Sequence, residues 1–517
     1  MKTKRIRQHT AERRPSPAVD TAPAPEPSEY QKRILEAVRS TSDNLMIQAC
    51  AGSGKTTTLR MICDALPPET RALALCFNKA VADEFGEKLP PHVEAGTFHS
   101  VGLKIIRAAV GAIKVNPRKL ENLIEDRLDA LVLDKKARAR RFMILKRMIP
   151  LALGTMTNIS DGGEALEELA ADYGVSTKKD AGWLLDLFAI IVETRRLKSE
   201  ISFGDMIDHP LWHNYPLPEY DIVLVDETQD LNAQQMEFVR RLANGNRVIA
   251  VGDRFQSIYG FRGAQPGAID IIKKQFGCAE LPLSVCYRCG YEIVRSAQEV
   301  VGREAILAAP GAAPGRVDRL EGENYQETMA SLKRGDMVLC RTNAPLVRPC
   351  VELIEAGVPA YVKGRDIGKG LLGLIDQHSD GFHDRDIFAF SSNIVCDAGA
   401  RQKGLLADNR QTAAEILQDQ IEIILVFLEG ATSISHVRSL VERVFSEAKD
   451  GVCFSSIHKA KGLEAPRVVF LGPELIPHRM AKQLGTQDAL DQERNLDYVA
   501  RTRAQGHLIF QPLPEKS

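Results

Sequence analysis

Short, almost uninterrupted apolar runs recur along the chain, separated by longer stretches with helical spacing. In the first half they predict strands at 44–49, 72–77, 221–226 and 247–253. In the second half they predict strands at 336–341, 451–458 and 467–472. A strand that is covered by helices on both faces is apolar on both sides, so such runs are typical of parallel sheets. The pattern therefore predicts an α/β fold with two parallel-sheet lobes, one in each half.

The segments between these strands suggest how the chain is divided. Residues 1–27 combine a basic start with a Pro/Ala-rich stretch, for which we expect a disordered tail. Helical patterns without strong strands occupy 101–202 and 365–449, and we expect them to be insertions. The first lobe would then comprise 28–100 and 203–282, and the second 283–364 and 450–517.

Composition limits the class of protein. The 517 residues are 44% hydrophobic and 26% charged, and the net charge is -1. No apolar run reaches the roughly 20 residues that span a bilayer, and no secretory signal follows the basic start, so we expect no membrane partner. The ten cysteines lack framework spacing, which favours the cytoplasm. A nucleic-acid site would have to be a local track of charge.

The stretch ACAGSGKTTTL (49–59) is close to the phosphate-binding pattern G-x-x-x-x-G-K-[ST], although Ala49 replaces the first glycine. Gly52 and Gly54 allow the backbone to turn its N–H groups toward an anion, at the start of a predicted helix. Lys55 would then contact the β- and γ-phosphates, and the Thr56 hydroxyl would bind Mg²⁺. The loop predicts a nucleoside triphosphate site but no particular activity.

A second nucleotide element is DIVLVDETQD, in which an apolar strand ends at Asp226 and Glu227. Ligand sites of parallel sheets lie at this end of the strands. Asp226 suits Mg²⁺ coordination, and Glu227 suits the positioning and deprotonation of an attacking water.

In their order and wording, these motifs resemble superfamily 1A DNA helicases, the UvrD/PcrA/Rep group, in a compact form with a reduced second insertion. That family has A-x-A-G-S-G-K-T as its phosphate loop, so Ala49 is the expected residue. The resemblance implies two RecA-like motor domains with ATP and Mg²⁺ between them. It also implies that the loop residues hold the nucleotide: Ala49, Cys50, Ala51, Gly52, Ser53, Gly54, Lys55, Thr56 and Thr57.

The resemblance assigns further nucleotide contacts along the chain. SEYQKRILEAV implies that Gln31 recognises adenine, and VGDRFQSIYGFRGA implies that Gln256 senses the γ-phosphate. VCYRCG implies that Tyr287 stacks on adenine and that Arg288 reaches the γ-phosphate. SSIHKAKGLEAPRVVFL places Glu464 on the ribose, and QERNLDYVARTRA places Arg503 as the arginine finger.

The same comparison implies a nucleic-acid track. It consists of Phe77, Asn78, Thr97, His99, Tyr259, Phe261, Arg262, His458 and Lys459. Phe261 stands where the family usually has tryptophan, and Tyr259 could instead belong to the core between the lobes. The basic run KKARARRFMILKR (135–147) could contact nucleic-acid phosphates or be a solvated helix face.

The resemblance implies an ATP-dependent 3′→5′ DNA helicase or translocase, acting on single strands and duplex junctions and associated with the nucleoid. An RNA helicase is a weaker alternative. The segment between Arg288 and Ser456 is short for the family. The chain could therefore be a DNA-stimulated ATPase switch that regulates a partner nuclease in repair or defence.

Overall fold

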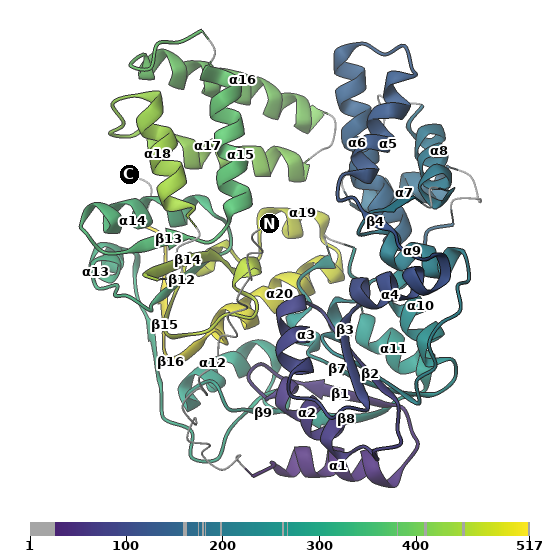
Figure 1. The fold of residues 1–517 in the computed structure, drawn as a ribbon. Coiled ribbons are helices and arrows are strands. Elements are labelled where there is room, and N and C mark those ends of the chain that lie inside the picture. The colour runs from purple at the N-terminus through teal and green to yellow at the C-terminus, as the bar shows by residue number, and fades with distance from the viewer. Residues whose placement is uncertain are drawn as a thin grey trace, which may run out of the picture.

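The computed structural model describes residues 26–158, 163–173, 175–177, 180, 182–196, 199–260, 263–265, 267–379, 381–407, 411–446 and 450–514. Within this part of the chain, two six-stranded sheets form, and every pairing within them is parallel. Figure 1 shows the two sheets side by side, with α20 (Gln487–Arg501) between them and helical extensions from each. The predicted α/β fold with two parallel sheets is confirmed.

The first sheet has the strand order β3-β2-β6-β7-β1-β8. Its strands are β1 (Leu45–Ala49), β2 (Ala72–Cys76), β3 (Val93–Thr97), β6 (Ile222–Val225), β7 (Arg247–Gly252) and β8 (Ala279–Leu283). The four inner strands were predicted from their apolar runs. The two edge strands, β3 and β8, were not predicted, because they are only partly buried and so lack a continuous apolar run.

The second sheet has the strand order β11-β16-β15-β12-β14-β13. Its strands are β11 (Arg316–Arg319), β12 (Met337–Cys340), β13 (Ala360–Val362), β14 (Val452–Ser456), β15 (Ala465–Leu471) and β16 (Ala504–Gln511). Three inner strands, β12, β14 and β15, were predicted. Edge strands β11 and β13 and inner strand β16 were not. A separate short pair joins β9 (Val285–Cys286) to β10 (Leu307–Ala308).

Each inner strand is apolar on both sides because it contributes to two cores. In β6, Ile222 and Leu224 pack on one face of the first sheet, while Val223 and Val225 pack on the other. Helices supply the opposing surfaces, as strands buried on both faces require. The first lobe has α1 (Glu29–Ser40), α2 (Lys55–Ala65), α3 (Lys79–Gly86), α10 (Ala233–Ala243) and α11 (Ala268–Phe276), and the second has α12 (Tyr291–Val301), α13 (Tyr325–Ala330), α14 (Ala344–Glu355), α19 (Arg479–Leu484) and α20.

The first helical extension has its own core around Trp183. It comprises α5 (Lys119–Asp129), α6 (Lys135–Gly154), α7 (Glu164–Asp172) and α8 (Trp183–Arg196), with a short pair of β4 (Lys114–Val115) and β5 (Glu200–Ile201). The flanking helices α4 (Phe98–Val110) and α9 (Asp205–Trp212) instead pack in the core of the first sheet. The basic run on α6 forms ion pairs within the extension: Arg138 with Asp129, Arg141 with Asp180 and Asp186, and Lys146 with Glu121. Much of that charge is therefore neutralised internally.

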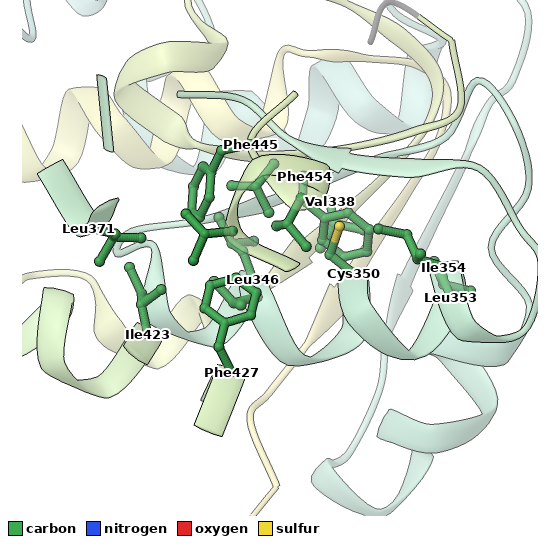
Figure 2. Packing of buried hydrophobic residues seen from close by; sticks show 14 of the residues in the cluster. Val338, Leu346, Cys350, Leu353, Ile354, Leu371, Ile423, Phe427, Phe445 and Phe454 are labelled. Atoms are coloured by element: carbon green, nitrogen blue, oxygen red, sulfur yellow. The ribbon is translucent and has the colours of Figure 1, made fainter. Parts of the chain in front are cut away.

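The second helical extension shares a core with its lobe. It comprises α15 (Arg365–Ser379), α16 (Ile387–Ala407), α17 (Gln411–Leu428) and α18 (Ile434–Val444). Figure 2 shows Leu371 of α15 and Phe427 of α17 packed near Leu346 of α14 and Phe454 of β14. The second extension therefore packs directly against the second sheet and α14. None of the helices that the structure describes has the length and apolar character to cross a bilayer.

Candidate functional site

The predicted site residues of the first lobe gather at one edge of its sheet. Because all six strands are parallel, their carboxyl ends lie at the same edge. Residues 50–54 follow β1, Phe77 follows β2, Glu227 follows β6 and Asp253 follows β7. The fold therefore brings together segments that are up to two hundred positions apart in the sequence.

The loop between β1 and α2 has the backbone that its glycines predict. Gly52 and Gly54 have φ angles of 67° and 78°, in the left-handed region that favours glycine. Gly54 is the N-cap of α2, so the positive end of that helix points at the loop. Lys55 opens the helix, and its Nζ lies 3.7 Å from Oε1 of Glu227. Burial lowers the pKa of Lys55, but nearby Glu227, Asp253 and Asp226 outweigh burial and raise it, so the ammonium stays charged.

A hydrogen-bonded chain joins the acidic pair to the glutamine of the next motif. The Gln229 Nε2 donates to Glu227, and the Gln229 Oε1 accepts from the Asp253 N–H at 3.0 Å. The Gln256 Nε2 donates to Asp253 Oδ2 at 2.7 Å. Gln256 is 4% exposed, so this network fixes its position. These hydrogen bonds would transmit a movement of Gln256 to Glu227.

The two adjacent acids are in different electrostatic environments. Burial and the Glu227 charge raise the pKa of Asp226 to about 7. Burial also opposes ionisation of Glu227, but Lys55 and Lys461 outweigh it and lower its pKa. Glu227 is thus the acid that stays ionised at neutral pH and can accept a proton. Asp226 and the exposed Thr56 hydroxyl are oxygen donors, the ligand type that Mg²⁺ prefers, so these residues fit that ion.

The segment that bears Tyr287 and Arg288 approaches this loop from the second lobe. The Tyr287 N–H donates to the Gly52 carbonyl at 2.9 Å, and an added Cβ on Gly52 would lie 2.6 Å from the Cβ of Arg288. The Arg288 guanidinium pairs with Glu464, and its Nη1 lies 3.4 Å from the Thr502 carbonyl oxygen. The glycine at position 52 is therefore also what allows the second lobe to approach.

Arg503 is buried without a carboxylate partner among the described residues. It is 1% exposed, and its guanidinium donates to the carbonyls of Val499 and Leu463 and to the Thr502 hydroxyl. Burial and the nearby Arg288 lower its pKa to about 10. A buried cation held only by neutral acceptors is suited to meet an anion such as a phosphate.

The remaining predicted nucleotide contacts surround the loop. The Gln31 Nε2 donates to the Thr58 hydroxyl at 3.1 Å, which places it beside α2, and its Oε1 accepts from the Ser28 N–H. Cys50, Ala51 and Ser53 are buried. Tyr287 is 53% exposed, which leaves its ring open to stacking.

The predicted nucleic-acid residues at positions 77, 78, 97 and 99 lie at or just after the ends of the neighbouring strands β2 and β3. Phe77 is 43% exposed, and His99 contacts Phe203 edge to face at 6.1 Å between ring centroids. Asn78 and Thr97 use their side chains as the N-caps of α3 and α4. Phe203, 55% exposed, was not predicted.

The other predicted nucleic-acid residues follow β7 or belong to the second lobe. The Tyr259 hydroxyl donates to the His458 carbonyl at 3.2 Å, so Tyr259 belongs to the contact between the lobes. Lys459 pairs with Asp366 of α15 at 2.5 Å. Phe261 and Arg262 lie outside the described residues.

One buried ion pair joins the two lobes and was not predicted. The Lys461 Nζ lies 2.5 Å from Asp230 Oδ2 and donates to the Gln256 carbonyl at 2.7 Å. Lys461 also lies 4.8 Å from the centre of the Tyr259 ring. Both residues occur within motifs evident in the sequence, HKAKGLE and DETQD, but no local pattern indicates that they pair.

Two parallel-sheet lobes with a phosphate loop in one and arginines from the other define a P-loop NTPase with two RecA-like domains. Sequence models of two domains match the chain: the UvrD/REP helicase N-terminal domain at residues 30–277 and the UvrD-like helicase C-terminal domain at 411–512. The chain belongs to the UvrD-like helicases of superfamily 1A.

Individual relatives agree with this assignment. The ATP-dependent DNA helicase PcrA of Bacillus subtilis is 29% identical over 296 residues, covering 52% of this chain and 38% of that protein. The F-box DNA helicase protein 1 of Schizosaccharomyces pombe is 23% identical over 521 residues, covering 93% of this chain and 57% of that protein. The ATP-dependent DNA helicase Rep of Buchnera aphidicola subsp. Schizaphis graminum is 26% identical over 301 residues, covering 52% of this chain and 43% of that protein. The chain thus spans about half the length of these relatives.

Proposed function

We propose that this protein is an ATP-dependent DNA helicase that moves 3′→5′ along single-stranded DNA. One observation carries the proposal. Lys55 and Glu227 of the first lobe face the same loop that Arg288 of the second lobe approaches, with the buried Arg503 cation beside it. An active site shared between two lobes makes hydrolysis depend on their closure, and closure is a movement that can be coupled to a bound strand.

The residues divide the chemistry between them. Lys55 and the N-terminus of α2 hold the β- and γ-phosphates, and Glu227 accepts a proton from the attacking water. Thr56 and Asp226 would hold Mg²⁺, which would neutralise phosphate charge. Arg288 and Arg503 stabilise the charge that develops on the transferred phosphoryl group. Gln256 contacts the γ-phosphate, and its movement shifts the loop that leads to Tyr259.

The nucleotide base and ribose contacts follow the family pattern. Gln31 pairs with the adenine edge, Tyr287 stacks on the ring and Glu464 binds the ribose. Glu464 also pairs with Arg288, so ribose binding would release Arg288 toward the γ-phosphate.

The strand would run across the carboxyl edge of both sheets. Phe77 offers an exposed ring, and stacking is worth roughly 1–3 kcal/mol per base. Asn78, Thr97 and His99 line the same edge, and His458 and Lys459 would contribute from the second lobe. Tyr259 couples the strand to Gln256, with Phe261 and Arg262 following it in the chain.

The test compares ATP hydrolysis with and without single-stranded DNA, alongside unwinding of duplexes with 3′ or 5′ tails. We expect stimulation by DNA and unwinding from the 3′ tail alone. The Lys55→Ala variant, the matched control, should lose both activities, and retained DNA-stimulated hydrolysis in it would refute the mechanism.

Hydrolysis that is stimulated by DNA without unwinding of either duplex would favour a different role. The chain would then be an ATPase switch that acts on a partner protein, such as a nuclease. Stimulation by RNA but not by DNA would favour an RNA helicase.

A further inference from the structure

One face of α20 contacts the first lobe at several points. It carries Gln492, Asn495 and Tyr498, whose three-residue spacing puts them on the same side of the helix. The Asn495 Nδ2 donates to the Ser257 carbonyl at 2.9 Å and to the Arg254 carbonyl at 3.3 Å. The Arg254–Gln256 turn (η2) that bears the Gln256 side chain is thus held by a helix of the other lobe.

The deepest contact of this face is with the phosphate loop. The Ala51 N–H donates to the Tyr498 hydroxyl oxygen at 2.9 Å, although the two residues are 447 positions apart. Both residues are 0% exposed. The Tyr498 ring also contacts Phe255 edge to face at 5.8 Å. Burial raises the pKa of Tyr498 well above its usual value, so the hydroxyl stays neutral and can serve as an acceptor.

The backbone of Tyr498 is tied to the segment that bears Arg503. The Tyr498 carbonyl accepts from the Thr502 N–H at 3.1 Å and from the Thr502 hydroxyl at 2.9 Å. The Arg503 Nε donates to the carbonyl of Val499, the next residue along. One residue therefore contacts the phosphate loop through its side chain and the Arg503 segment through its backbone.

We propose that Tyr498 is a positioning residue whose hydroxyl couples the shape of the phosphate loop to closure of the two lobes. When the lobes separate, water can accept from the Ala51 N–H. When the lobes close, the Ala51 N–H is buried and donates to the Tyr498 hydroxyl oxygen. Loss of the hydroxyl therefore destabilises the closed arrangement selectively. This inference rests on the proposed function, because closure is the step in which Arg503 meets the nucleotide.

The test is Tyr498→Phe, which keeps the ring and removes the hydroxyl. Binding of a non-hydrolysable ATP analogue engages the arginines of the second lobe, whereas ADP has no γ-phosphate to do so. We expect the affinity for the analogue to fall about tenfold and that for ADP to stay within about twofold. DNA-stimulated kcat/KM should fall by the same factor as the affinity for the analogue.

Tyr291→Phe is the matched control, because Tyr291 is 53% exposed on α12 and lies outside the site. It should leave both affinities unchanged. If Tyr498→Phe lowers both affinities equally, or neither, the proposal is wrong. If that variant does not fold, Asn495→Ala tests the same face and should give the same selective loss. Wild-type protein that shows no DNA-stimulated hydrolysis would refute the proposed function, while the ratio of the two affinities would still test Tyr498.

Discussion

Replacement of Lys461 by methionine tests whether the buried ion pair between the lobes controls hydrolysis. The side chains of Lys461 and Asp230 are 8% and 1% exposed. Methionine keeps much of the volume and the apolar stem of lysine but removes the charge. The substitution leaves the Asp230 carboxylate buried, and its Oδ1 already has no hydrogen-bond partner within the described chain.

The expected magnitude follows from this burial. Removing one partner of a buried ion pair costs about 3–5 kcal/mol, because the other charge is left uncompensated. Since the pair joins the two lobes, the cost falls on the arrangement in which the lobes are closed. About 3 kcal/mol corresponds to a loss of roughly a hundredfold in kcat/KM for ATP.

Protonation of Asp230 limits this loss and makes it depend on pH. Burial raises the pKa of Asp230 to about 6, although Lys461 opposes that rise. Without Lys461 the pKa must rise further. A carboxyl whose pKa is raised in the closed state weakens closure increasingly as pH rises toward that pKa, because closure then requires the carboxyl to take up a proton. The defect of Lys461→Met should therefore grow between pH 6 and pH 8.

The assay is DNA-stimulated ATP hydrolysis at pH 6 and pH 8 for three proteins: wild type, Lys461→Met and the Lys461→Met/Asp230→Asn double variant. We expect the double variant to recover to within about tenfold of wild type, since no charge remains buried. A single variant that is equally defective at both pH values, together with a double variant that is no better, would refute the reasoning.

Three further substitutions test other parts of the argument. Lys119→Met should lower the free energy of unfolding in urea by about 3–5 kcal/mol, because it leaves the buried Asp205 carboxylate, 2.7 Å from the Lys119 ammonium, without its cation. A smaller loss would contradict this prediction. Gly52→Ala should abolish ATP hydrolysis, because the added Cβ would collide with Arg288 of the second lobe. Gly357→Ala is the control and should stay active, because Gly357 also has a positive φ of 80° but no atom lies within 4 Å of an added Cβ. Arg503→Met should lower kcat about a thousandfold without lowering Tm, since it removes a buried cation that is held only by neutral acceptors. A large fall in Tm would indicate that Arg503 has a structural role instead.

Most inner strands could be predicted because their local pattern reflects their surroundings, whereas inner strand β16 was missed because its first half is polar and only partly buried. Residues such as Leu224 and Val225 alternate between two apolar cores, so the run is apolar throughout. The edge strands β3 and β8 could not be predicted in this way, because an edge is partly exposed and tolerates polar residues. Phe203 was missed for a related reason, since a single exposed ring has no periodic signal.

The sequence by itself determined the elements that local physics controls. Alternating burial along the strands, the glycines of the phosphate loop and the residue types of the nucleotide motifs are all evident from neighbouring positions. The tertiary structure decided which of these residues meet. The pairing of Lys461 with Asp230 and of Tyr498 with Ala51 depends on how two lobes pack, and it joins positions 231 and 447 residues apart. No local pattern encodes such contacts, because their stability comes from burying both partners at once in the contact between the lobes.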